Sequence, residues 1–319
     1  MKHTRREFVR ILFAASQAGV AGRILQGSLF AEPAATENGL NFIVFGDWGR
    51  EAEADQVGVA TQMAKASKAM GAKFVISVGD NFYEDGVAST EDKQWKDSFE
   101  AVYDATALQI PWRVILGNHD YHGNCDAQIA YSKISHRWGM PERYYTRTER
   151  IDANALVDFF YIDTTPMIKL YYDEAGKEKT RANVITQDVP KQMAWFKRSL
   201  AASKAEWKIV VGHHPIYSGG DHGDTAELIE SILPLLHEYK VQAYFCGHDH
   251  DLQHLTAGDV NLFISGAGSQ VRPTTETEHT KFAQSSSGLT TVSLHADRMN
   301  LQMIDINGTV VYETTVPRG

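Results

Sequence analysis

The chain has 319 residues and a formal net charge of -9. With 43% hydrophobic and 22% charged residues, its composition is that of a soluble globular protein long enough to bury a sizeable core. No basic run and no interleaving of aromatic and basic residues follows the N-terminus, so nucleic acid is excluded as an expected partner.

The N-terminus has the features of an export signal. Arg5 and Arg6 form a twin arginine, and a mildly apolar, Ala- and Gly-rich stretch follows over residues 11–30. This stretch is too short and too weakly apolar to span a membrane. We therefore expect residues 1–35 to be a twin-arginine signal peptide and linker, which would take a folded bacterial protein through the twin-arginine export machinery to the periplasm or the medium. The alternative is an amphipathic first helix of the folded domain.

The rest of the chain predicts one α/β domain over residues 36–319. Short apolar runs alternate with helical patterns until residue 246, and strands alone follow, with no internal repeat; this order favours packed sheets with helices outside. Residues 163–188 lack a period and are expected to be a long surface loop, and residues 272–287 a variable loop. We expect helices at 54–70, 91–104, 126–138, 190–203 and 224–239, and strands at 41–45, 73–78, 111–116, 144–148, 156–162, 207–211, 241–245, 252–256, 260–265, 289–295, 299–305 and 309–316.

Five predicted strands each end in a glycine followed by a polar residue, and these clusters are Gly46-Asp47, Gly79-Asp80, Gly117-Asn118, Gly212-His213 and Gly247-His248. In open α/β folds ligands collect at such strand ends. The carboxylate of Asp80 and the phenol of Tyr83 can reach one metal ion, although Asp80 could instead be a turn residue that caps a helix, with Tyr83 as a packing residue. Oxygen and imidazole donors without cysteine suit iron, zinc or manganese. The donors are too many for one ion, so the sequence predicts a two-metal site of the kind that hydrolyses phosphoesters.

The motif order GDWG, GDNFY, GNHD, GHHP and GHDH resembles the calcineurin-like metallophosphoesterases. Within them it is similar to the small, tartrate-resistant purple acid phosphatases over most of residues 40–316. The resemblance implies a metallophosphoesterase sandwich (αββα), with two packed mixed sheets flanked by helices. Where many members of the superfamily carry a histidine, this chain has Gly49, and the hard phenolate donor of Tyr83 suits a trivalent ion.

The resemblance also assigns site residues. It implies that Fe(III) is bound by Asp47, Tyr83 and His250, that a divalent Fe(II), Zn or Mn ion is bound by Asn118, His213 and His248, and that Asp80 bridges the two. It places His119 and His222 in the substrate pocket, where either could hydrogen-bond phosphate and one could protonate the leaving oxygen. Without the resemblance, His222 would be expected to be a solvated loop residue. No ligand role is expected for His122, His214 or His254.

The expected function is an acid phosphatase that releases inorganic phosphate from phosphomonoesters, with a metal-bound hydroxide as nucleophile. Alternatives are a phosphodiesterase or nucleotide pyrophosphatase at the same site, or an exported protein that binds phosphate or iron without turnover. We expect a monomer with no membrane or nucleic-acid partner.

Two minor expectations concern charge and cysteine. Lys177, Lys179 and Arg181 could meet substrate phosphate, but a solubilising role is preferred. Cys246 is expected to be buried and Cys125 to lie in a polar loop; the two could pair after export, but free thiols are favoured.

Overall fold

The computed structural model describes residues 39–173 and 178–319. Within these ranges, no helix has both the length and the apolar character needed to cross a membrane. The expected signal peptide and linker, residues 1–35, lie outside the described residues, so the export prediction stays a prediction.

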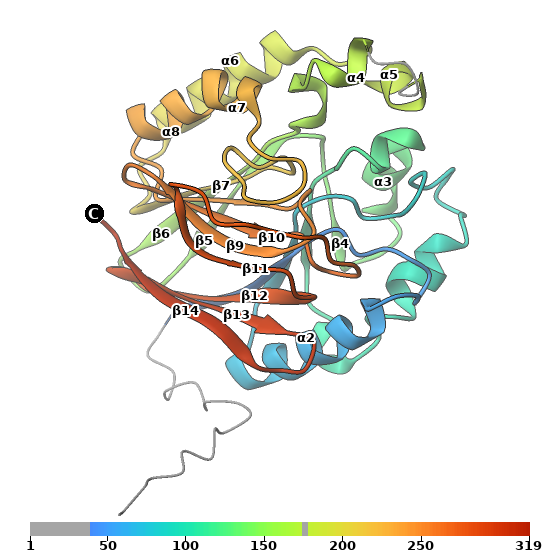
Figure 1. Ribbon diagram of the computed structural model, residues 1–319, viewed down its shortest axis with the longest axis horizontal. Coiled ribbons are helices and arrows are strands. Elements are labelled where there is room, and N and C mark those ends of the chain that lie inside the picture. The colour runs from blue at the N-terminus through green and yellow to red at the C-terminus, as the bar shows by residue number, and fades with distance from the viewer. Residues whose placement is uncertain (1–38, 174–177) are drawn as a thin grey trace, which may run out of the picture. The chain divides into compact units, whose positions relative to one another are not determined.

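Two mixed seven-stranded sheets form the centre of the fold, which confirms the expected architecture (Figure 1). The strand order is β14-β13-β12-β1-β2-β3-β4 in the first sheet and β11-β9-β10-β8-β7-β6-β5 in the second. The first sheet consists of β1 (Leu40–Phe45), β2 (Phe74–Ser77), β3 (Trp112–Val114), β4 (Trp138–Gly139), β12 (Gly288–Leu294), β13 (Arg298–Asp305) and β14 (Val310–Pro317). The second consists of β5 (Tyr145–Arg150), β6 (Leu156–Tyr161), β7 (Trp207–Val211), β8 (Ala243–Cys246), β9 (Leu252–Ala257), β10 (Val260–Ser265) and β11 (Thr280–Gln284).

The central strands are covered on both faces, and β1 illustrates how. Phe42 and Val44 belong to the core between the sheets, whereas Ile43 and Phe45 belong to the core shared with the helices. Side chains of a strand alternate between its two faces, so an unbroken apolar run requires a cover on each side. The rings of Phe42 and Phe159, one from each sheet, meet edge to face with centroids 5.4 Å apart.

Helices cover the outer faces of the sheets. Figure 1 shows α2 beside the first sheet and α6, α7 and α8 over the second. Helix α2 ends at Gly71, whose left-handed backbone (φ 63°) suits glycine. Asp188 precedes α6, and its side chain accepts a hydrogen bond from the Lys191 backbone. The long helices are α2 (Gln56–Met70) and α6 (Val189–Ala202), and the short ones are α3 (Cys125–Tyr131), α4 (Leu170–Asp173), α5 (Glu178–Val184), α7 (Ala226–Ser231) and α8 (Leu233–Glu238).

Residues 163–188 are not the long surface loop that the sequence predicts. They contain a 3₁₀ turn at Thr165–Met167 followed by α4 and α5. Ile168, Tyr171 and Val184 are buried in the core, where they anchor these short helices. Their irregular spacing gives no helical period, which is why the pattern could not be recognised.

Three predicted helices are shorter than expected. Residues 91–104 hold only a π-helical turn, η1 (Trp95–Glu100), whose Trp95 and Phe99 rings both contact the ring of Trp138, at 4.9 and 5.1 Å between centroids. The helix predicted at 126–138 ends at Tyr131. The helix predicted at 224–239 divides into α7 and α8 because Pro234 has no N–H to continue the ladder.

Two further expectations need correction. Cys125 is not in a polar loop: it is buried as the first residue of α3, and both cysteines are free thiols. Residues 272–287 are not wholly a loop, because they include β11, which pairs antiparallel with β9 at the edge of the second sheet.

Candidate metal centre

The five glycine-led clusters meet because their strands are parallel neighbours. β1, β2 and β3 lie side by side in the first sheet, and β7 and β8 do so in the second. Parallel strands bring their carboxyl ends to one edge. Hydrogen bonds then join the sheets: the His248 backbone N–H lies 3.2 Å from both carboxylate oxygens of Asp47, and His213 Nδ1 lies 2.9 Å from the Val78 carbonyl oxygen.

Tyr83 lies at the centre of the first group of predicted ligands. Its hydroxyl oxygen is 3.1 Å from Asp47 Oδ1, 2.9 Å from Asp80 Oδ2 and 3.0 Å from His250 Nε2. His250 Nδ1 is buried and has no hydrogen-bond partner among the described residues. The structure thus brings together all the residues that the sequence analysis groups around the first ion.

His213 lies at the centre of the second group. Its Nε2 atom is 3.1 Å from Asn118 Oδ1 and 3.5 Å from Asp80 Oδ1, and its ring centroid is 5.1 Å from that of His248. Because the Val78 carbonyl can only accept, His213 Nδ1 carries the proton and Nε2 presents its lone pair to this group. Asp80 therefore faces both groups, one with each carboxylate oxygen.

The backbone at three predicted ligands is in the left-handed region. Asp47, Asp80 and His248 have φ values of 61°, 48° and 70°. Residues other than glycine rarely adopt this conformation, and it concentrates at functional sites. A side chain on Gly117 would place its Cβ 2.2 Å from Asp80 Oδ1, and one on Gly247 would place it 2.2 Å from Asp47 Oδ2. These two glycines leave the space that the carboxylates occupy.

The carboxylates at the centre are buried without a basic side chain paired to them. Asp47 and Asp80 are 0% and 1% exposed, and within the described part of the chain neither forms an ion pair with Lys or Arg. Burial raises the pKa of Asp47 to about 8. Burial opposes ionisation of Asp80 too, but His213 and His119 hold its pKa below the usual range. Burial and both carboxylates raise the pKa of the Tyr83 phenol. A bound cation would favour the ionised forms of Asp47 and Tyr83 and offset the charge of all three groups.

The donor atoms fit a pair of metal ions. The set contains only oxygen and imidazole nitrogen, which suits iron, zinc or manganese. Two clusters each offer ligand atoms within 4.8 Å of one another, and they consist of Asp47, Asp80 and His213, and of His213, His214 and His248.

His214 is close to the second cluster but is held by other partners. Its Nδ1 atom is 2.8 Å from Thr164 Oγ1, and its Nε2 atom is 2.8 Å from the Tyr171 hydroxyl. Both ring nitrogens are therefore engaged, and the expectation that His214 is not a ligand stays a prediction. The contact ties α4 to the edge of the candidate site.

The two predicted pocket histidines adjoin the centre. The His119 backbone N–H donates to Asp80 Oδ1 (2.8 Å), and its ring lies 4.4 Å from the Tyr83 ring with Nδ1 2.7 Å from the Glu84 carbonyl oxygen. That carbonyl can only accept, so Nδ1 donates and Nε2 is left available.

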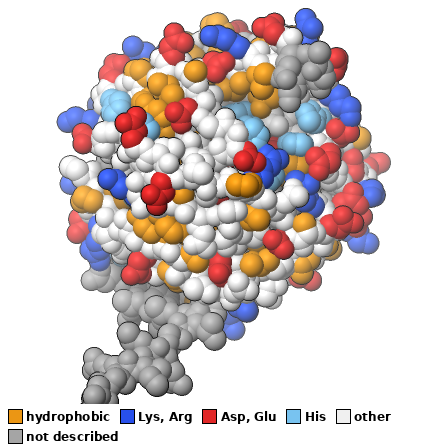
Figure 2. Space-filling model, in the orientation of Figure 1, with side chains coloured by type: hydrophobic (Ala, Val, Ile, Leu, Met, Phe, Trp, Pro, Cys, Tyr) orange, Lys and Arg blue, Asp and Glu red, His pale blue; other side chains and the backbone are white. Residues whose placement is uncertain are grey.

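His222 is not simply a solvated loop residue. Its Nδ1 atom is 2.9 Å from Asp249 Oδ1, and its ring centroid is 4.0 Å from that of His248. Its side chain remains 37% exposed. Figure 2 shows histidine side chains at the surface of one face, beside acidic and basic ones.

A buried hydrogen-bond network that the sequence analysis did not assign supports the ligand loops. Asp120 accepts hydrogen bonds from the backbone of Asn81 (3.1 Å) and Gly117 (2.8 Å) and from Gln128 Nε2 (2.7 Å). Asp120 thus joins the loop that carries Asp80 to the loop that follows β3. The only indication in the sequence that Asp120 belongs to the site is its position in the GNHD motif. Which groups it would join depends on the fold.

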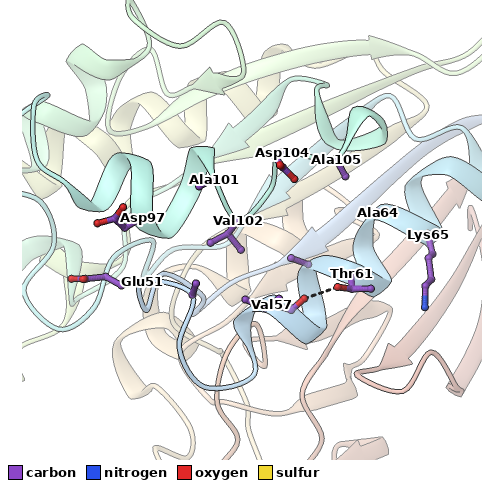
Figure 3. A pocket seen from close by; sticks show the side chains of 12 residues that line it. Glu51, Val57, Thr61, Ala64, Lys65, Asp97, Ala101, Val102, Asp104 and Ala105 are labelled. Carbon is purple, nitrogen blue, oxygen red and sulfur yellow. Dashed lines mark hydrogen bonds between the residues drawn. The ribbon is translucent and has the colours of Figure 1, made fainter.

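A groove elsewhere on the domain contains no predicted site residue. It lies between α2 and residues 97–105, has a volume of about 740 Å³ and is lined by residues such as Val57, Lys65 and Asp104 (Figure 3). It offers no histidine or paired buried carboxylate, so we place the chemistry at the strand ends.

Comparisons with known proteins agree with this geometry. A model of the calcineurin-like phosphoesterases matches residues 40–252. Purple acid phosphatase 17 of Arabidopsis thaliana is 42% identical over 76% of this chain and 72% of its own length. Tartrate-resistant acid phosphatase type 5 of Rattus norvegicus is 35% identical over 93% of this chain and 96% of its own length.

Solved structures show the same architecture. GAP50, described as the anchor in the inner membrane complex of Plasmodium, superposes with a TM-score of 0.78 at 25% identity, covering 88% of this chain and 89% of its own. Purple acid phosphatase PPD1 from yellow lupin has a TM-score of 0.65 at 16% identity, covering 87% and 53% of the two chains, and shows the fold alone. The chain therefore belongs to the calcineurin-like phosphoesterases and, among them, to the small purple acid phosphatases of the tartrate-resistant type.

Proposed function

We propose that this protein is an acid phosphatase that hydrolyses phosphomonoesters at a pair of metal ions. The observation that carries the proposal is the position of Asp80, whose two carboxylate oxygens face Tyr83 at 2.9 Å and His213 at 3.5 Å. One carboxylate between two donor groups is the arrangement that a bridged metal pair needs. The acid phosphatase names of relatives that match nearly the full chain support the choice of reaction.

The proposed ligands divide between the two groups. Asp47, Tyr83 and His250 would hold Fe(III), and Asn118, His213 and His248 would hold Fe(II), Zn or Mn, with Asp80 shared. Support comes from the donor chemistry: a phenolate and two carboxylates are hard anionic ligands that favour a trivalent ion, while imidazoles suit a divalent one. When bound, such a pair neutralises phosphate oxygens and activates water.

The chain's own groups have separate tasks in this proposal. His119 and His222 each have Nδ1 directed at a fixed acceptor, the Glu84 carbonyl and the Asp249 carboxylate. Fixing Nδ1 orients the ring, so Nε2 is the atom that, in the protonated ring, can hydrogen-bond a phosphate oxygen or give a proton to the leaving oxygen. We also propose, from Arg5 and Arg6, that the protein is exported folded to the periplasm or medium.

Turnover of two chromogenic esters tests the reaction. Purified metal-loaded protein should hydrolyse 4-nitrophenyl phosphate between pH 4 and 7, and it should do so faster than at alkaline pH. Tartrate should not inhibit this hydrolysis. It should be much slower on bis(4-nitrophenyl) phosphate. Preference for the diester would replace the proposal by a phosphodiesterase, and no turnover of either ester would remove the hydrolase assignment.

A visible spectrum tests the metal assignment separately. A phenolate bound to Fe(III) has a charge-transfer band, so the oxidised protein should be violet and should contain two metal ions per chain. Tyr83→Phe should lose the band, whereas the control Tyr217→Phe, a half-buried tyrosine stacked on His279, should keep it. An iron-loaded wild type without colour, or a coloured Tyr83→Phe variant, would show that Tyr83 is not a ligand.

A further inference from the structure

Arg272 is a cation beside the candidate site that has no carboxylate partner. Within residues 39–173 and 178–319 no Asp or Glu lies within ion-pair distance of its guanidinium. Arg50, which lies over the Tyr83 ring, differs because it is paired with Glu84 at 2.7 Å. A guanidinium left without an internal anion is suited to bind an external one.

The backbone holds Arg272 directly against a predicted ligand. Its N–H donates to the His250 carbonyl at 3.0 Å, and its own carbonyl accepts from Ser285 Oγ at 2.7 Å. These bonds fix the residue at both sides of its Cα. The backbone position of Arg272 beside the candidate site is therefore set by the fold, although the sequence predicts only a variable loop here.

The side chain of Arg272 lies one layer outside the predicted ligands. The ring of His222 stacks on His248 with centroids 4.0 Å apart, and Arg272 Nη1 lies 3.2 Å from His222 Nε2 and 3.4 Å from Nδ1. The order from the centre outwards is thus His248, His222, Arg272. An ester whose phosphoryl group is at the metal ligands would extend its other end toward the outer layers.

The present contact of Arg272 is one that an anion could replace. His222 Nδ1 faces the Asp249 carboxylate, which can only accept when ionised, so in the neutral ring Nδ1 carries the proton. Arg272 Nη1 is nearly equidistant from the two ring nitrogens, so it lies against the face of an uncharged ring and is not aligned with the Nε2 lone pair. Hydrogen bonds between a guanidinium and an oxyanion are about twice as strong as those to a neutral group. A carboxylate or phosphate would therefore compete well for the guanidinium.

The acidic and basic groups are distributed unevenly around the centre. Near Tyr83, Glu84 neutralises Arg50 and Asp85 pairs with Lys179. Near His222, Asp249 is shared between His222 and Ser218, and Arg272 adds a positive charge with no carboxylate partner. An incoming substrate would therefore place a second negative charge more favourably near Arg272.

We propose that Arg272 binds a second oxyanion on the leaving group of the substrate and so gives the enzyme a preference for esters that carry one. This inference rests on the proposed phosphatase function and extends it to a substrate class: phosphomonoesters whose alcohol portion bears a carboxylate or a further phosphate. The contact is a hydrogen-bonded ion pair outside the metal ligands. It acts on substrate binding and so on KM.

Matched aryl esters test the proposal. The kcat/KM of metal-loaded protein is measured for 4-carboxyphenyl phosphate, 1,4-phenylene bisphosphate and 4-nitrophenyl phosphate, and each charged ester is expressed as a ratio to the nitro ester. Arg272→Gln should lower both ratios about tenfold or more, mainly through KM, and Arg272→Lys should lose less. High salt should weaken the wild-type preference. The control Lys281→Gln removes an exposed charge from β11 and should change neither ratio.

The outcomes separate this inference from the proposed function. Ratios that do not change in Arg272→Gln, or an equal loss on all three esters, would overturn the leaving-group contact while leaving the phosphatase intact. A loss confined to one charged ester would identify the carboxylate or the phosphate as the preferred oxyanion. A wild type inactive on every ester would refute the phosphatase and this inference with it. Urea midpoints within error of wild type would show that the variants are folded.

Discussion

Replacement of Trp48 by phenylalanine should weaken the support beneath the candidate metal centre. Trp48 follows Asp47 directly, is fully buried and lies among aromatic rings that include Phe45 and Trp112. Its indole N–H donates to Ser77 Oγ at 2.8 Å, and that hydroxyl donates to Asn81 Oδ1 at 2.6 Å. These two hydrogen bonds connect the loop that carries Asp47 to the loop that carries Asp80.

The expected loss has two parts. A tryptophan buries roughly 150–250 Å², most of which a phenyl ring would still cover. Losing roughly 40 Å² at about 25 cal/mol per Å² costs about 1 kcal/mol. The Ser77 hydroxyl also loses its donor inside the core, which costs about 1 kcal/mol more. We therefore expect Trp48→Phe to lower the free energy of unfolding by about 2 kcal/mol, a large share of the ~5–15 kcal/mol of a typical domain.

Urea unfolding of the metal-free protein, followed by far-UV circular dichroism, measures this loss without interference from the changed fluorescence. Trp195→Phe is the matched control, because Trp195 is only partly buried and packs on Tyr144 at the surface of α6. It should cost less than about 1 kcal/mol. Combining Trp48→Phe with Ser77→Ala should give a coupling energy of about 1 kcal/mol.

Two results would refute this reasoning. If Trp48→Phe cost no more than Trp195→Phe, the indole would not support the centre. If the losses from Trp48→Phe and Ser77→Ala simply added, the hydrogen bond between them would not matter, and only the packing argument would survive.

Three further predictions concern pH, metal content and export. Burial lowers the pKa of His254 to about 4, so the folded state resists protonation of this ring. The free energy of unfolding should therefore be steady above the unfolded pKa of about 6.5. It should fall by up to about 3 kcal/mol as the pH drops toward 4. His254→Gln should flatten that fall in urea midpoints, and equal slopes would contradict the assignment. Asp80→Ala should lose both metal ions and His213→Ala mainly the divalent one, as measured by elemental analysis; two ions retained in Asp80→Ala would show that it does not bridge. Replacing Arg5 and Arg6 by lysine should leave unprocessed precursor inside the cell, and normal export of that variant would argue against a twin-arginine signal.

The sequence alone was sufficient for features that depend on a few neighbouring residues. An apolar run followed by glycine and Asp80 predicts a strand and a polar turn wherever it occurs, so the strands and the glycine-led clusters were found. Helix α6 was predicted over residues 190–203, one residue from its observed bounds, Val189–Ala202. By contrast, the helices within 163–188 were missed, because their buried residues anchor to a core that other segments build.

Tertiary structure decided which of these local features meet. Tyr83 and His250 are 167 residues apart, yet their polar atoms lie 3.0 Å apart because β1 and β2 share one sheet, β7 and β8 share the other, and the two sheets pack together. Asp80, which lies between them, has a positive φ of 48°. Arg272 lies in a stretch without any motif. Its guanidinium reaches His222 only because the chain returns to the second sheet and hydrogen-bonds to the carbonyl of His250. Such placements depend on strand order and register over the whole domain, and no local pattern contains that information.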